Sequence, residues 1–140
     1  MTLKKTHDAE IKHSGDTLQF FCHGQAKKNG WWTDMTTGQD LTSSGYPLIA
    51  PTRNVGELLC LVHSEISEAM EGHRKMMADD KLPNRSMLEV ELADAVIRIF
   101  DMSGGLGLDV SGAIVEKLAY NASREDHKIS NRRAVNGKKF

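Results

Sequence analysis

The amino-acid sequence predicts an all-α protein folded as a four-helix bundle. Four segments carry apolar residues at helical spacing, residues suited to helix caps stand at the segment ends, and no segment alternates in the manner of a strand. Each helix has one apolar stripe to bury, and the connections after the second and third segments are short. Antiparallel packing of neighbouring helices in one bundle therefore follows.

The composition is that of one globular domain. The chain has 140 residues, of which 39% are hydrophobic and 26% are charged. No apolar run approaches the roughly 20 residues that span a bilayer, and no apolar segment typical of a secretory signal follows the N-terminus. The formal net charge of −1 gives no general attraction to nucleic acid. We expect a cytoplasmic protein with neither a membrane nor a nucleic acid as partner.

The first helix is expected within the first thirty residues. Residues 1–16 are polar and lack periodicity, so we expect a flexible N-terminal arm without a role in the core. A helical pattern starts near Thr17 and ends at Gly30. Residues 31–53 are rich in Thr, Ser, Gly and Pro and form a long connection, a length that is usually functional in a compact domain, such as a lid.

The second and third helices carry recognisable start signals. Asn54 with Glu57, and Ser86 with Glu89, have the spacing of a helix N-cap and its reciprocal partner. The second pattern continues to about residue 77, and the third runs from 87 to 102 until a glycine-rich stretch ends it.

The fourth helix is expected to begin after Asp109 and to extend from Val110 to about Lys128. The predicted domain therefore covers residues 17–128. Residues 129–140 are expected to be a basic C-terminal tail.

The third helix carries a row of charges on an otherwise apolar circumference. Glu91, Asp94, Arg98 and Asp101 fall within about 80° of one another on a helical wheel. Partly buried carboxylates so close together repel each other and lose hydration, which is costly without a compensating cation. Arg98 offsets only one of these charges.

The second helix carries a matching acidic pair. Glu65 and Glu68 stand three residues apart at the edge of its apolar stripe, whereas Glu71 points away. If the two helices pack antiparallel, the pairs Glu65/Glu68 and Glu91/Asp94 converge as an oxygen cage for Mg²⁺, with Mn²⁺ as a substitute. The alternatives are an ordinary solvated surface and a di-iron site. A di-iron bundle uses Glu-x-x-His motifs, and the one such match here lies in the N-terminal arm.

The fourth helix carries a basic stripe. Lys117, Asn121, Arg124 and Lys128 share about 60° of the helix surface. Such a stripe is either a solvated face or, beside a metal cage, a clamp for phosphate groups.

These motifs together resemble the MazG-like, all-α nucleoside triphosphate pyrophosphohydrolases. Glu65-x-x-Glu68 and Glu91-x-x-Asp94, separated by 22 residues, resemble the ExxE and ExxD signature of this family. Supporting similarity lies in Lys27-Lys-Asn-Gly-Trp-Trp32 and in Lys117-Leu-Ala-Tyr-Asn121-Ala-Ser-Arg124, and the resemblance covers about residues 18–128.

The resemblance implies a bundle of that type and Mg²⁺-dependent hydrolysis of a (deoxy)nucleoside triphosphate to the monophosphate and pyrophosphate, in house-cleaning or control of nucleotide pools. The implied roles are metal binding by Glu65, Glu68, Glu91 and Asp94, with Glu68 or Glu65 orienting the attacking water. The implied phosphate or sugar ligands are Lys117, Asn121 and Arg124. Asp101 and Arg98, which share the helix face of Glu91 and Asp94, are candidates for contacting the metal ligands without binding the metal themselves.

Three further expectations accompany this resemblance. Trp31 or Trp32 stacks on the base, the alternative for each being core packing. The protein is a homodimer or homotetramer. The other functional readings are a phosphoribosyl-ATP pyrophosphatase and a non-catalytic bundle that binds nucleotides.

Overall fold

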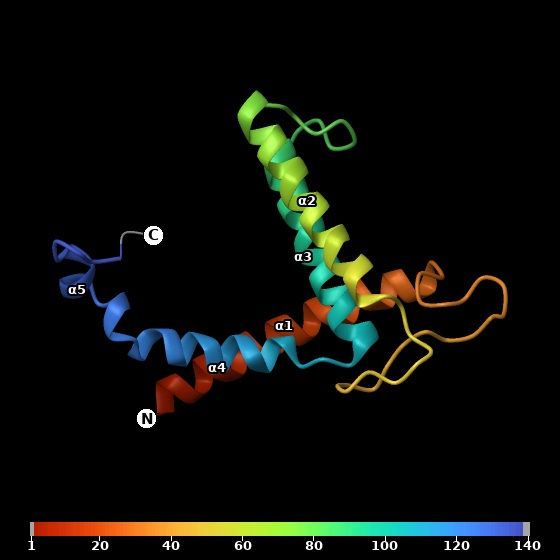
Figure 1. The fold of residues 1–140 in the computed structure, drawn as a ribbon, viewed down its shortest axis with the longest axis horizontal. Helices are drawn as coiled ribbons and strands as arrows, with labels where there is room; N and C mark the ends of the chain where they lie inside the picture. Colours follow the sequence, from red (N-terminus) through yellow and green to blue (C-terminus); the bar gives the residue numbers. More distant parts are fainter. Residues whose placement is uncertain (1, 139–140) are drawn as a thin grey trace. The chain divides into compact units, whose positions relative to one another are not determined.

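A computed structural model describes residues 2–138 and confirms the all-α class (Figure 1). No strand occurs among these residues, which contain only two isolated β-bridges. The helices are α1 (Thr2–Lys28), α2 (Val55–Lys75), α3 (Met87–Leu106), α4 (Val110–Ser123), the 3-10 helix η1 (Glu125–His127) and α5 (Ile129–Arg133). None of the described helices is long and apolar enough to cross a membrane.

The chain divides into two compact units. The middle unit comprises Thr17–Leu108, and the terminal unit comprises the residues on either side, up to Asp16 and from Asp109 onward. Helix α4 groups with the N-terminal segment, although the sequence analysis assigned it to the same domain as α2 and α3. The bundling of all four helices stays a prediction.

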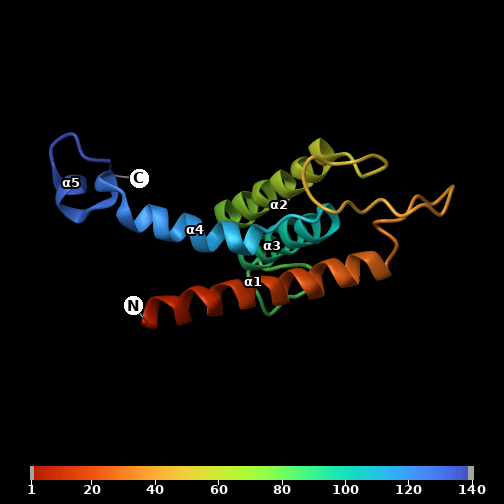
Figure 2. The same ribbon diagram turned by 90° about the horizontal axis from the view of Figure 1, so that it is seen from below.

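Helices α2 and α3 form an antiparallel pair in the middle unit and run side by side in two views (Figures 1 and 2). Both predicted N-caps are confirmed: the Asn54 side chain accepts from the Glu57 backbone N–H, and the Ser86 side chain from that of Glu89. The turn between the helices starts at Met76, whose φ of 52° ends α2. The connection folds back on itself, and Ala78 and Ser86 form an isolated antiparallel bridge between its two ends.

Helix α3 is longer than the sequence predicts, because glycine does not end it at residue 104. It continues to Leu106 and ends at Gly107, whose φ is 66°. Gly105 lies against the Trp32 ring so closely that an added Cβ would stand 2.1 Å from it. Trp32 has no exposed surface and joins Leu58 and Leu106 in the core of the middle unit. The glycine is therefore a packing position inside the helix.

Helix α1 is continuous from Thr2 to Lys28, so it starts earlier than the sequence predicts and includes most of the expected N-terminal arm. Gly15 is buried against Ser111 of α4, and Lys12 pairs with Asp16 and Asp109. These contacts need one small residue and several charges, so they leave no apolar stripe for periodicity to detect.

The C-terminal end of the predicted fourth helix is also wrong. Helix α4 ends at Ser123, and Arg124 adopts extended backbone before η1 and α5. The Arg124 guanidinium donates hydrogen bonds to the Asp126 carboxylate two residues ahead, and residues with this spacing do not face each other on a continuous helix. The predicted tail begins with α5, and its last two residues lie outside the described part of the chain.

Candidate metal centre

Three carboxylates from the facing surfaces of α2 and α3 come together in the middle unit. One oxygen of each of Glu65, Glu91 and Asp94 lies within 4.8 Å of the others. Glu65 and Glu91 are buried, and Asp94 is more exposed than either. The antiparallel pairing predicted from the short connection brings these residues together from two helices.

Arg98 supplies the cation that stabilises this cluster. Its Nε donates a hydrogen bond of 2.6 Å to Oε1 of Glu65, and 42% of the Arg98 side chain is exposed, against 7% for Glu65. The guanidinium thus neutralises the most buried carboxylate while keeping one side in solvent. One positive charge leaves the remaining carboxylates uncompensated.

Glu91 shows the consequence of that excess negative charge. Burial, the hydrogen bond with Glu65, and the charges of Glu68, Glu65 and Asp94 together raise the pKa of Glu91 to about 7. A buried carboxyl group among other carboxylates retains its proton, because ionisation would add a further negative charge in a poorly solvated place. Displacement of that proton by a metal ion is chemically favourable.

Glu68 lies beside the three-carboxylate cluster without belonging to it. It is exposed, and it lines a cavity of about 360 Å³ together with the clustered acids and Arg98. Glu71, which the helical wheel placed elsewhere, forms an ion pair with Lys75 on the same helix.

The connection between α2 and α3 contributes two residues that the sequence analysis missed. Asp79 is buried, and its Oδ1 accepts hydrogen bonds from the backbone N–H groups of Lys81 and Leu82. Asp79 and Lys81 line the same 360 Å³ cavity. An Asp whose side chain accepts from a backbone N–H two residues ahead is a sequence signal for a turn. Its position beside the clustered carboxylates depends on how the connection folds back, which the local sequence does not show.

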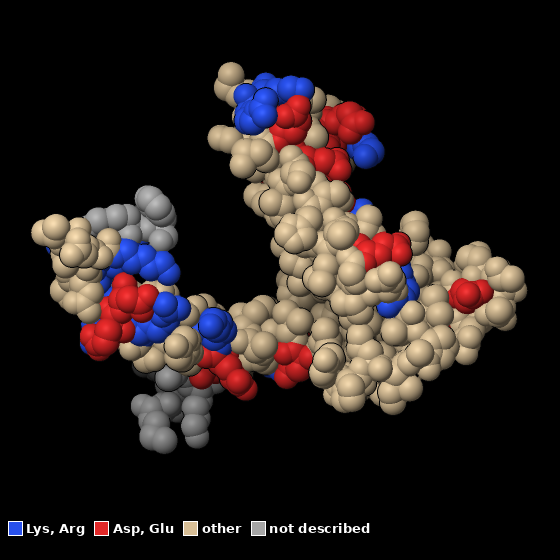
Figure 3. Space-filling view, viewed as in Figure 1, with Lys and Arg blue, Asp and Glu red and all other residues tan. Residues whose placement is uncertain are grey.

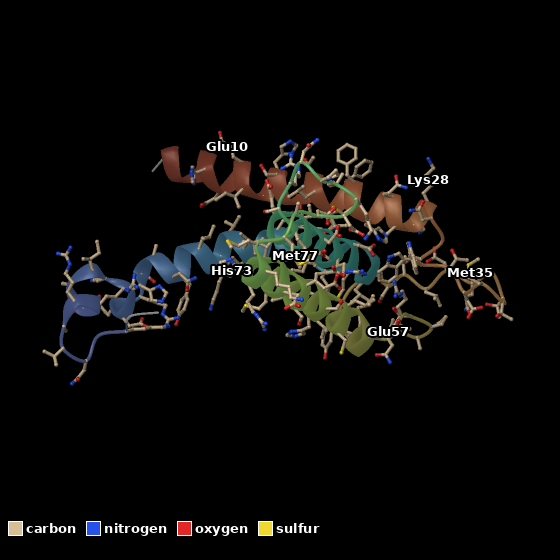
Figure 4. The ribbon with its side chains drawn as sticks, turned by 90° about the horizontal axis from the view of Figure 1, so that it is seen from above. Glu10, Lys28, Met35, Glu57, His73 and Met77 are labelled. Carbon is tan, nitrogen blue, oxygen red and sulfur yellow. The ribbon has the colours of Figure 1, made fainter. Side chains whose placement is uncertain are left out.

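A second cavity, of about 740 Å³, adjoins the first because Asp94 and Arg98 line both. Its walls combine apolar side chains with Asp101, Arg53 and Glu57, and Figure 4 places Glu57 near the start of α2. The lining residues come from α1, α2, α3 and the segment between α1 and α2: Phe21, Cys22, Gln25, Ala26, Asn29, Trp31, Arg53, Glu57, Leu58, Leu61, Asp94, Ile97, Arg98 and Asp101.

The two tryptophans have different environments. Trp31 lines the large cavity and is 64% exposed, which leaves its ring available to a ligand. Trp32 is fully buried, with the Arg53 guanidinium 5.5 Å from its ring centroid. The structure therefore supports the core-packing alternative for Trp32 and corrects its assignment as a base-stacking residue.

Asp101 shares a helix face with the acidic cluster but bonds elsewhere. Its Oδ1 accepts a hydrogen bond of 2.7 Å from the Trp32 indole and lies 3.0 Å from Nδ1 of His23. These partners turn Asp101 toward the core and the large cavity, and it is not one of the three clustered acids.

The predicted phosphate ligands belong to the terminal unit, where each has local contacts. Lys117 Nζ lies 4.8 Å from the centroid of the Tyr120 ring, and Arg124 binds Asp126. Asn121 Oδ1 is buried and has no hydrogen-bond partner among the described residues. The acidic cluster belongs to the middle unit, so the joint action of these groups stays a prediction.

The cluster fits a hard divalent cation. Ligands on opposite sides of Mg²⁺ lie about 4.2 Å apart at its usual metal–oxygen distance, so oxygens within 4.8 Å need only small side-chain rotations. An all-oxygen donor set favours Mg²⁺ or Mn²⁺ over softer metals. No protein-family model, curated protein sequence or solved structure matches this chain.

Proposed function

We propose that the protein is a Mg²⁺-dependent hydrolase that cleaves (deoxy)nucleoside triphosphates to the monophosphate and pyrophosphate. The observation that carries the proposal is the position of the acidic cluster. Glu65, Glu91 and Asp94 line a small polar cavity, and Asp94 and Arg98 connect it to a larger cavity with aromatic walls. A nucleotide has the same division into a charged phosphate end and a flat apolar base.

The residues of the middle unit suit distinct steps of this reaction. Glu65, Glu91 and Asp94 would hold the cation, and Glu68, which faces the same cavity, would orient the attacking water. Arg98, at the boundary of the two cavities, has the charge and geometry to bind a phosphate oxygen. The bound cation would polarise the phosphorus centre and acidify the water.

The terminal unit carries the other candidate substrate ligands. Lys117, Asn121 and Arg124 keep the roles that the family resemblance implies, and Trp31 remains the candidate for base stacking because its ring is exposed in the large cavity.

The first test is release of pyrophosphate from a panel of canonical nucleoside triphosphates with Mg²⁺ or Mn²⁺. We expect turnover by the wild type and a loss of about 100-fold or more in both Glu68→Gln and Asp94→Asn, since each removes charge that positions the cation or water. Glu71→Gln is the matched control, because Glu71 is on the same helix and pairs with Lys75. Unchanged turnover in both test variants would exclude the proposed mechanism.

The same assay separates the two remaining functional readings. Activity confined to phosphoribosyl-ATP would identify the phosphoribosyl-ATP pyrophosphatase reading. Mg²⁺-dependent nucleotide binding without any pyrophosphate release would identify a non-catalytic nucleotide-binding protein.

A further inference from the structure

Asp101 is held in a fixed orientation by two donors. The Trp32 indole N–H can only donate, and it bonds Oδ1 at 2.7 Å. His23 Nδ1 lies 3.0 Å from the same oxygen, and a carboxylate oxygen only accepts, so we assign the hydrogen to Nδ1. Trp32 and His23 are themselves packed edge to face, with ring centroids 5.4 Å apart. Trp32 is fully buried and the His23 side chain is 18% exposed, so packing holds both donors in place.

This arrangement places both donors on one oxygen and leaves the other oxygen of Asp101 without a protein donor. Among the side chains of residues 7–138 and the described backbone groups, none donates a hydrogen bond to Oδ2. The side chain is only 15% exposed, and Asp101 lines the 740 Å³ cavity. Oδ2 is not one of the atoms that are buried without a partner, so it remains open to the cavity, where the donor of a ligand can reach it.

The cavity around Asp101 has the chemistry of a nucleoside site. Trp31 and Phe21 provide aromatic surface, and Leu58, Leu61 and Ile97 provide apolar contacts. Its volume is within the range of small-molecule sites, which are apolar with a few fixed polar groups. The acidic cluster lies in the adjoining cavity beyond Asp94 and Arg98, so the phosphates of a bound nucleotide would point away from Asp101.

We propose that Asp101 determines nucleoside selectivity: its Oδ2 accepts a hydrogen bond from an N–H or O–H donor of the nucleoside in the large cavity. The inference rests on the proposed function for the nature of the ligand. It differs from support of the metal ligands, because the partners of Asp101 are Trp32 and His23. The donor is an exocyclic amino group of the base or a hydroxyl group of the sugar.

The first experiment changes the ligand and leaves the protein intact. Calorimetry without metal measures the dissociation constants of nucleoside 5′-monophosphates that differ by one donor. The pairs are cytidine and uridine, guanosine and inosine, adenosine and purine riboside, and each ribonucleoside with its 2′- and 3′-deoxy forms. We expect one donor, on the base or on the sugar, whose removal weakens binding at least about tenfold, the effect of one hydrogen bond to a charged group.

The second experiment repeats these measurements with Asp101→Asn, in which an amide replaces the carboxylate. We expect the ratio between the preferred nucleotide and its donor-deleted analogue to fall to within about threefold. Glu57→Gln is the matched control: Glu57 is another carboxylate of the same cavity, exposed and 3.8 Å from Arg53, and its variant should retain the wild-type ratio. Thermal unfolding of each variant verifies that the fold is kept.

Three results would overturn the inference: no monophosphate binds, no donor deletion weakens binding, or Asp101→Asn keeps the full discrimination. If Asp101→Asn does not fold, the series of donor-deleted nucleotides measured on the wild type still tests whether binding depends on a nucleoside donor. The hydrolase proposal fails separately. Absence of pyrophosphate release together with Asp101-dependent selectivity would reject hydrolysis and leave the nucleoside site in place.

Discussion

Glu91 is the residue whose chemistry depends most on its neighbours. Its burial is the largest cause of its raised pKa, followed by the hydrogen bond with Glu65 and the charges of Glu68, Glu65 and Asp94. With a pKa of about 7, Glu91 holds its proton over much of the range in which an ordinary glutamate is ionised. Both the metal affinity and the unfolding free energy should therefore depend on whether Glu91 is protonated.

Mg²⁺ affinity should rise as the pH increases through about 7, the pKa of Glu91, because the carboxyl must lose its proton to become a ligand. Calorimetry at about pH 6 and about pH 8, in buffers of different ionisation enthalpy, measures the affinity and the protons released. Glu91→Gln should weaken binding and flatten this pH dependence. A wild-type affinity that does not change over this range would contradict the assignment of Glu91 as a ligand.

Without metal, the folding free energy should also depend on Glu91, with a definite sign. The folded pKa is about 7, above the ordinary glutamate value of 4.5, so the unfolded chain loses this proton first as the pH rises. As the pH rises from 4.5 to about 7, the unfolding free energy of the wild type should fall relative to that of Glu91→Gln. Above about pH 7 the difference between the two proteins should stay constant. Urea unfolding at a series of pH values tests this, and parallel stability curves for the two proteins would refute it.

Helix α3 has a glycine, Gly105, at the position where the Trp32 ring packs against its backbone. Gly105→Ala should destabilise the protein by about 1–3 kcal/mol, because the added methyl overlaps the Trp32 ring. Gly24→Ala is the control: nothing lies within 4 Å of its Cβ position in α1, and the loss of a helical glycine should stabilise the protein by about 0.5–1 kcal/mol. Chemical denaturation gives both values, and equal effects would disprove the packing role.

The N-terminal half of α1 shows why sequence periodicity missed a helix. Its contact with α4 is made through Gly15 and Ser111, and Lys12 adds ion pairs with Asp16 and Asp109. A glycine within a polar segment usually signals a loop, yet here the absence of a side chain allows the backbone to approach Ser111. Local sequence cannot distinguish these two uses of glycine.

The α2–α3 pair has large apolar side chains in contact with solvent. Leu59, Ile66 and Met70 of α2 and Leu92 and Val96 of α3 are each more than 40% exposed. On the face shown in Figure 3, charged groups gather at the upper end of this pair, where the chain passes from α2 to α3 in Figure 1. The middle of the pair shows little charge on this face. Such a surface is typical of one that another protein chain covers.

We therefore expect a homodimer or homotetramer, measured by light scattering after size-exclusion chromatography. Ile66→Glu should shift the protein towards the monomer, since it places a charge within the apolar surface. Ile129→Glu is the matched control, because Ile129 is exposed on α5 in the terminal unit. A wild-type monomer, or equal dissociation of both variants, would contradict an interface on this surface.

The all-α class, the starts of α2, α3 and α4, and the acidic residues on the facing sides of α2 and α3 could be predicted from the sequence, because caps and helical periodicity are local properties. Which side chains contact each other depends on how distant segments pack. The tertiary structure placed Arg98 on Glu65, Asp101 on Trp32 and His23, and Gly15 against Ser111. A helical wheel gives the direction of a side chain but not its partner, and these assignments depend on residues distant in the chain.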